Sequence, residues 1–134
     1  MSRSYTRETV LKTIFQLDFY ENEQIEKYTD FIKEFNLKET DFQYAKELIV
    51  NIYEKKDKID LLINKYLVKW DVKRINAMEL AILRLAVFEI LYIETIPVPV
   101  SINEAINFTV KYSDSESVKY INAVLEKIAK ETVH

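Results

Sequence analysis

The chain has 134 residues, of which 49% are hydrophobic and 31% are charged, and its net charge at neutral pH is −3. This length and apolar content suffice for one folded domain with a core of its own. Cysteine is absent, which excludes disulfide bonds, thiolate metal sites and a cysteine nucleophile. The only histidine, His134, is the last residue, and a frayed end cannot hold catalytic geometry. We therefore expect no catalytic residue, no metal site and no cofactor.

Glycine is also absent, and proline occurs only at positions 97 and 99. Tight hairpins and phosphate-binding loops both depend on glycine, so the composition predicts an all-α protein without a nucleotide-binding loop. The first twelve residues lack the apolar segment of a signal peptide. The most apolar stretch, 85–93, is interrupted by Glu89 and is too short to span a bilayer. We expect a cytoplasmic protein that does not associate with membranes.

Apolar residues recur at helical spacing along most of the chain, which predicts about seven helices. Four of them cover about residues 5–20, 24–34, 58–65 and 72–92, and Asp71 is the expected N-cap of the last of these. The other three begin at sequences of the capping-box form, which are Thr40–Gln43, Ser101–Glu104 and Ser113–Glu116. Residues 96–100 contain both prolines and are expected to be non-helical.

The predicted helix at 72–92 differs from the others because its polar residues scatter around the helix and form no single face. A helix that is apolar nearly all round is normally surrounded by other helices. We therefore expect it to be central, with charges such as Arg84 and Glu89 paired inside the fold or placed at an interface. We favour an internal partner for Arg84 and Glu89, and an ion pair between Arg84 and Glu104 is one example of such an arrangement.

Three segments of the chain resemble, in order, signature segments of the transcription antitermination factor NusB family. They are NAMELAILRLAVFE at 76–89, IPVPVSINEA at 96–105 and KYINAVL at 119–125. Arg3 and Arg7, together with Phe15–Asp18, match the family's opening helix, so the resemblance extends from Arg3 to Ile128. It implies a NusB-like fold of about seven helices in two packed helical bundles. We expect the N-terminal bundle at about residues 1–66 and the C-terminal bundle at about 67–134.

The resemblance also implies a function. A factor of this family pairs with ribosomal protein NusE, binds single-stranded boxA RNA and works in the RNA polymerase antitermination complex on ribosomal RNA operons, without catalysis. We expect a monomer or a weak homodimer. The RNA-binding residues implied are Arg3, Arg7, Phe15, Gln16, Lys119, Tyr120 and Asn122. The partner-binding residues implied are Tyr66, Arg74 and Glu79.

Each of these residues also has a plain structural interpretation. The arginines can belong to a solvated helix start, and the resemblance supports an RNA contact more for Arg7 than for Arg3. Tyr120 and Phe15 can stack on a base or lie at the edge of the core. Because the family has Phe at the position of Tyr120, the ring is the common requirement, and we expect Tyr120→Phe to be nearly neutral. Asn122 can contact a base edge or cap a turn, and the two readings are evenly balanced.

The chain departs from the family at several positions, where Ser4 and Leu80 replace common basic residues and Ala123 replaces a glycine. These changes weaken the basic surface, which leaves open a NusB-like protein-binding scaffold with weakened RNA binding. A second alternative is a detached NusB-like domain of an rRNA cytosine methyltransferase. The absence of a glycine-rich methyl-donor loop and of cysteine argues against it.

Overall fold

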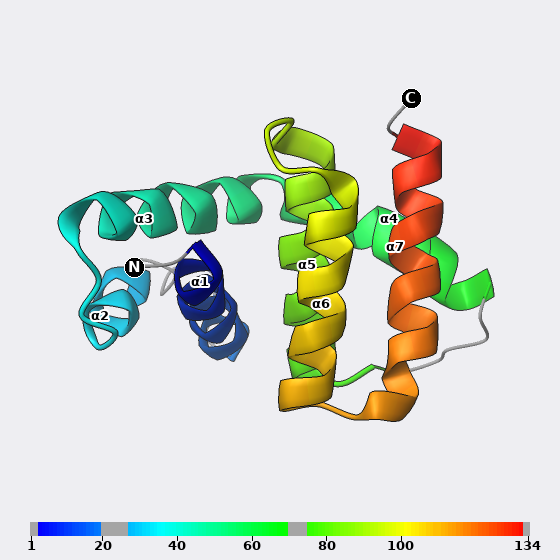
Figure 1. The fold of residues 1–134 in the computed structure, drawn as a ribbon, viewed down its shortest axis with the longest axis horizontal. Coiled ribbons are helices and arrows are strands. Elements are labelled where there is room, and N and C mark those ends of the chain that lie inside the picture. Colours follow the sequence, from blue (N-terminus) through cyan, green and yellow to red (C-terminus); the bar gives the residue numbers. More distant parts are fainter. Residues whose placement is uncertain (1–2, 20–26, 70–74, 133–134) are drawn as a thin grey trace. The chain divides into compact units, whose positions relative to one another are not determined.

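The computed structural model describes residues 3–19, 27–69 and 75–132, and every regular element within them is helical (Figure 1). The all-α class is therefore confirmed. The helices are α1 (Arg3–Leu17), α2 (Tyr28–Lys33), α3 (Glu39–Glu54), α4 (Lys56–Lys69), α5 (Ala77–Tyr92), α6 (Val98–Tyr112), the short 3-10 helix η2 (Ser115–Ser117) and α7 (Val118–Thr132). None of the helices in these ranges is long and apolar enough to cross a membrane.

The chain forms two compact units, an N-terminal unit of residues 1–54 and a C-terminal unit of residues 55–134. In the N-terminal unit α1 packs against α2 and α3, and α2 also contacts α3. In the C-terminal unit α5 contacts α4, α6 and α7. The division falls before α4, whereas we expected it near residues 66–67. The reason is that the apolar stripe of α4, which includes Ile59 and Ile63, is buried in contacts with α5 and α7.

Helix α5 is the central helix of the C-terminal unit, as its uniform apolarity predicted. Residues 81–90 are all buried, so no side of this stretch faces solvent. The helix begins at Ala77 because Asn76 and Glu79 form a capping box. The Asn76 Oδ1 accepts a hydrogen bond from the Glu79 backbone N–H at 2.8 Å. The expected N-cap, Asp71, lies outside the described residues.

Two of the expected capping boxes lie inside helices. Helix α3 begins at Glu39, and the Gln43 amide donates to the Glu39 carboxylate at 2.9 Å instead of capping with Thr40. Helix α6 begins at Val98, so residues 98–100, which we expected to be extended, form its first turn. Proline is tolerated there because the first helical N–H groups have no partner within the helix.

The start of α7 and the turn before α3 follow simple local chemistry. The carboxylate of Asp114, and not Ser113, caps η2 by accepting from the Glu116 N–H at 3.0 Å, and α7 follows directly from Val118. Asn36 has φ 57°, the left-handed conformation that asparagine tolerates better than most residues. In a chain without glycine, this asparagine provides the turn between α2 and α3.

Candidate nucleic-acid interface

The expected RNA-binding residues of the N-terminal unit lie on α1. Arg7 is only 5% exposed, so the solvent-facing phosphate contact that we expected of it is not what the structure shows. The same helix buries Thr9 and Thr13, and the Thr13 hydroxyl donates to the Thr9 carbonyl at 2.8 Å. Arg3 is the first residue of the helix, and its side chain lies outside the described part of the chain.

An aromatic pair lies at the C-terminal end of α1. Phe15 and Gln16 are half-buried, and the Phe15 ring meets that of Phe19 edge to face with centroids 5.3 Å apart. Phe19 is 69% exposed, so it presents a flat apolar face on which an unpaired base could stack. We did not predict a role for Phe19. Its spacing of four residues from Phe15, which places both on one side of a helix, was the available signal.

The expected RNA-binding and partner-binding residues of the C-terminal unit meet in one polar network. The Glu79 carboxylate, at the start of α5, accepts hydrogen bonds from the hydroxyl groups of Ser113, at 2.6 Å, and Tyr120. The Asn76 backbone N–H donates to the same carboxylate at 3.4 Å, and the Asn76 side-chain amide donates to the Ser113 hydroxyl at 3.0 Å. The network thereby joins the first turn of α5 to the end of α6 and the first turn of α7.

The network changes the ionisation of both central groups. Burial by itself raises the pKa of Glu79, but hydrogen bonds from Ser113, Ser117 and Tyr120 outweigh it and hold the pKa below its ordinary value. Burial and the hydrogen bond to Glu79 raise the pKa of Tyr120 to about 12. At neutral pH a carboxylate therefore accepts from a neutral tyrosine hydroxyl, which is a charge-assisted hydrogen bond.

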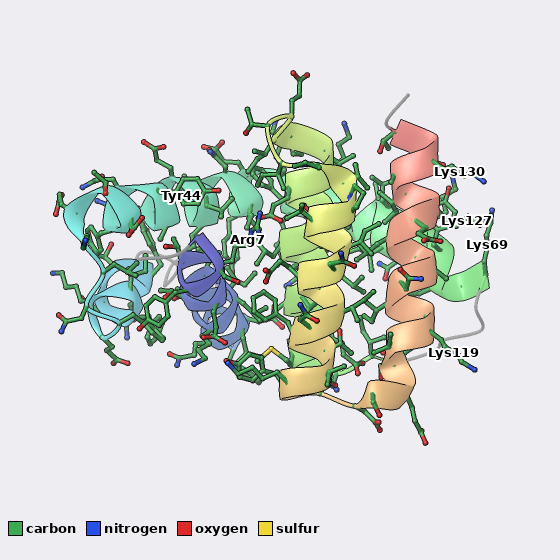
Figure 2. The ribbon with its side chains drawn as sticks, in the orientation of Figure 1. Arg7, Tyr44, Lys69, Lys119, Lys127 and Lys130 are labelled. Atoms are coloured by element: carbon green, nitrogen blue, oxygen red, sulfur yellow. The ribbon has the colours of Figure 1, made fainter. Side chains whose placement is uncertain are left out.

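This geometry corrects two expectations. Glu79 is 4% exposed and its carboxylate is engaged within the chain, so it is not the surface contact for a partner that we expected. The hydroxyl of Tyr120 donates a hydrogen bond within this network. We did not expect this role, because the family has Phe at this position and Phe has no hydroxyl. The Tyr120 ring and Asn122 are half-buried, whereas the adjacent Lys119 is exposed and points away from α7 (Figure 2).

The other expected partner-binding residues are Tyr66 and Arg74. Tyr66 is 7% exposed, and its hydroxyl donates to the Glu131 carboxylate of α7 at 2.8 Å. This hydrogen bond raises the pKa of the Tyr66 hydroxyl. The ammonium groups of Lys65 and Lys69 lie 5.2 and 5.1 Å from the centre of its ring, and Lys65 also pairs with Glu131. Arg74 lies outside the described residues.

The buried charges of α5 have partners within the C-terminal unit. The Arg84 Nε and Nη2 each lie 2.9 Å from a carboxylate oxygen of Asp60 on α4, which forms a two-pronged ion pair. We did not predict Asp60 as a partner of Arg84. Glu89 is 1% exposed and accepts a hydrogen bond from the Ser101 hydroxyl at 2.9 Å. These contacts connect α5 to α4 and to α6.

Two variants of Tyr120 separate the role of its ring from that of its hydroxyl. Tyr120→Phe should lower the free energy of unfolding by about 1–2 kcal/mol, because it removes a hydrogen bond to a partly buried carboxylate. It should leave RNA affinity unchanged. Tyr120→Ala should in addition weaken RNA binding by about 1–3 kcal/mol if a base stacks on the ring.

Chemical denaturation and RNA titration of both variants provide the measurements. If Tyr120→Ala loses stability but binds RNA as tightly as Tyr120→Phe does, the residue is only structural, and no base stacks on it.

The fold and these sites define an all-helical protein in which a polar network connects the start of the buried central helix α5 to the end of α6 and the first turn of α7. The model of the NusB family matches residues 4–130, and the chain belongs to this family.

Curated relatives and solved structures agree with this assignment. The chain is 39% identical to the transcription antitermination protein NusB of Clostridium perfringens strain SM101, over 97% of the chain and 98% of the relative. It is 40% identical to that of Bacillus pumilus, over 96% and 95%. The structure of NusB from T. maritima matches with a TM-score of 0.86 and 32% identity, over 100% of this chain and 94% of the T. maritima chain. A chain in the crystal structure of the antitermination factors NusB and NusE in complex with double-stranded RNA matches with a TM-score of 0.83 and 27% identity, over 96% of each chain.

Proposed function

We propose that this protein is a transcription antitermination factor that pairs with ribosomal protein NusE and binds boxA RNA during ribosomal RNA transcription. The observation that supports this proposal most strongly is the similarity to NusB relatives. For the Clostridium perfringens protein it spans nearly the whole of this chain and of the relative, at 39% identity. The similar structure of NusB with NusE and RNA supports both partners. The protein acts as a non-catalytic adaptor in the cytoplasmic RNA polymerase complex.

The described surfaces fit an adaptor that needs its partner in order to hold RNA firmly. Phe19 and the half-buried Phe15 and Tyr120 offer faces for stacking, and Lys119 offers an exposed ammonium group. The net charge of −3 and the burial of Arg7 leave few phosphate contacts on these residues. Because affinity for RNA scales with the number of phosphates neutralised, a second protein must supply the remaining contacts.

Titration of boxA RNA with and without NusE tests this proposal. We expect weak binding by the protein alone and at least roughly tenfold tighter binding with NusE, which corresponds to about 1.4 kcal/mol. A scrambled RNA of equal length and composition is the matched control and should not gain this affinity. Equal affinities with and without NusE, or for boxA and scrambled RNA, would contradict the proposal.

The burial of Arg7 favours one alternative, a scaffold that binds NusE but not RNA. The same titration distinguishes this scaffold from an RNA-binding factor, because the complex of the scaffold with NusE would not bind boxA RNA. The detached methyltransferase domain gains no support, since the chain matches 98% of the Clostridium perfringens protein, which is itself a NusB.

A further inference from the structure

Four lysines form a basic surface on the C-terminal unit. Lys69 ends α4, and Lys119, Lys127 and Lys130 lie on α7; all four are exposed. Figure 2 shows the four side chains pointing to the same side of this unit. Lys119 and Lys130 are eleven residues apart, about three helical turns, so they lie on the same face of α7. We call these four residues the α4–α7 lysine face.

Contacts between the two helices bring Lys69 into this surface. Its ammonium group lies 5.1 Å from the centre of the Tyr66 ring, and the Tyr66 hydroxyl donates to Glu131 of α7 at 2.8 Å. Glu131 and Glu126 are exposed carboxylates in the second half of α7, and Glu131 is already paired with Lys65. The other, Glu126, lies beside Lys127 and reduces the positive charge of the face without cancelling it.

Basic residues are distributed unevenly between the two units. The sequence of the N-terminal unit has seven basic and eleven acidic residues, whereas that of the C-terminal unit has twelve and eleven. Several acidic residues of the C-terminal unit are engaged internally, including Asp60 with Arg84, Glu79 with Tyr120 and Glu89 with Ser101. The surface of this unit therefore carries a more positive net charge than the counts of its basic and acidic residues give. Such a surface attracts polyanions to its lysines.

A groove beside two of these lysines indicates which part of a polyanion they contact. It has a volume of about 490 Å³ and is lined by Val98, Pro99, Ile102, Glu126, Lys127, Ala129 and Lys130. Among the residues that the structure describes, this lining contains no aromatic ring on which a base could stack, and stacking is the usual means of holding unpaired bases. The lysines are therefore suited to the phosphates of a strand and not to its bases.

We propose that the α4–α7 lysine face binds the sugar–phosphate backbone of RNA that flanks the boxA element, independently of the flanking sequence. At 1.5 Å per residue, Lys119 and Lys130 are separated by about 16 Å along the axis of α7, a length that several phosphates of a strand occupy. This inference rests on the proposed function, because boxA and NusE position the RNA from which the flanking strand extends.

The test compares boxA RNA with the same RNA extended by about ten uridines, a length within the site size of single-strand binding proteins, in the presence of NusE. The wild type should bind the extended RNA more tightly and with a steeper salt dependence. The Lys127→Gln/Lys130→Gln variant should lose about 1.4 from the log–log salt slope on the extended RNA, because each phosphate contact contributes about 0.7 for single strands. Its affinity for unextended boxA should not change, and adenines in place of uridines should give the same result.

The matched control is Lys33→Gln/Lys38→Gln, which removes two exposed lysines of the N-terminal unit and should leave both titrations unchanged. An unaltered salt slope for Lys127→Gln/Lys130→Gln on the extended RNA would overturn the inference. If this variant lost NusE binding while its salt slope stayed unaltered, the inference would also be overturned, because the α4–α7 lysine face would then contact NusE and not RNA. Failure of the wild type to bind boxA with NusE would instead overturn the proposed function, which keeps the two failures distinct.

Discussion

The Ile82→Asp variant should be unfolded at room temperature. Ile82 is 1% exposed near the middle of α5, the helix that contacts α4, α6 and α7. The substitution buries a carboxylate without a partner and removes a large apolar side chain, and each change costs several kcal/mol. Their sum is comparable to the whole stability of a domain this size, about 5–15 kcal/mol. Far-ultraviolet circular dichroism and thermal melting provide the measurement.

Leu61→Asp is the control for this variant, because it places the same carboxylate on a leucine of α4 that is 72% exposed. Its melting temperature should stay within a few degrees of the wild type, since surface substitutions usually change stability by at most about 0.5 kcal/mol. A wild-type melting temperature for Ile82→Asp would show that α5 is not the central helix of its unit.

The Asp60→Ala variant should have the second largest effect. It removes the two contacts of 2.9 Å that the Asp60 carboxylate makes with Arg84, whose side chain is 9% exposed. Breaking a buried ion pair costs about 3–5 kcal/mol, and the 26% exposure of the Asp60 side chain reduces that cost. We expect a loss of about 2–3 kcal/mol in the free energy of unfolding, measured by denaturant titration.

Asp57→Ala, at an exposed position in the first turn of α4, is the matched control and should cost less than about 1 kcal/mol, the usual upper value for a surface carboxylate at a helix N-terminus. The double variant Asp60→Ala/Arg84→Leu should recover part of the loss, because an apolar side chain then replaces the buried guanidinium that has lost its Asp60 contacts. Equal losses for Asp57→Ala and Asp60→Ala would show that the ion pair contributes nothing to stability.

The sequence predicted the helices well and their starting points poorly. Helical periodicity depends on many residues, so it identified α5 as the buried central helix. A capping box is a pattern of two residues that also occurs inside helices, as at Thr40 and Ser101. What decides such a position is tertiary: the Ser101 hydroxyl donates to Glu89 of α5, which no local pattern indicates.

The sequence named candidate site residues, but it did not predict the geometry in which the structure places them. The KYINAVL segment drew attention to Lys119, which is exposed, and to Tyr120, which is half-buried; their contact with RNA stays a prediction. The burial of Glu79 depends on Ser113 and Tyr120, which lie 34 and 41 residues away in the chain. The pair of Arg84 with Asp60 spans 24 residues. Periodicity shows which face of a helix is buried, but it does not show which polar group of another helix will meet it.

Transcription through a terminator placed after a boxA sequence tests the central claim most directly. The measurement is the fraction of full-length transcript made by RNA polymerase with NusE, with and without this protein and with boxA intact or scrambled. An antitermination factor should raise readthrough only when the protein, NusE and an intact boxA are present together. Readthrough that does not change on addition of the protein, or that rises equally with a scrambled boxA, would contradict the account.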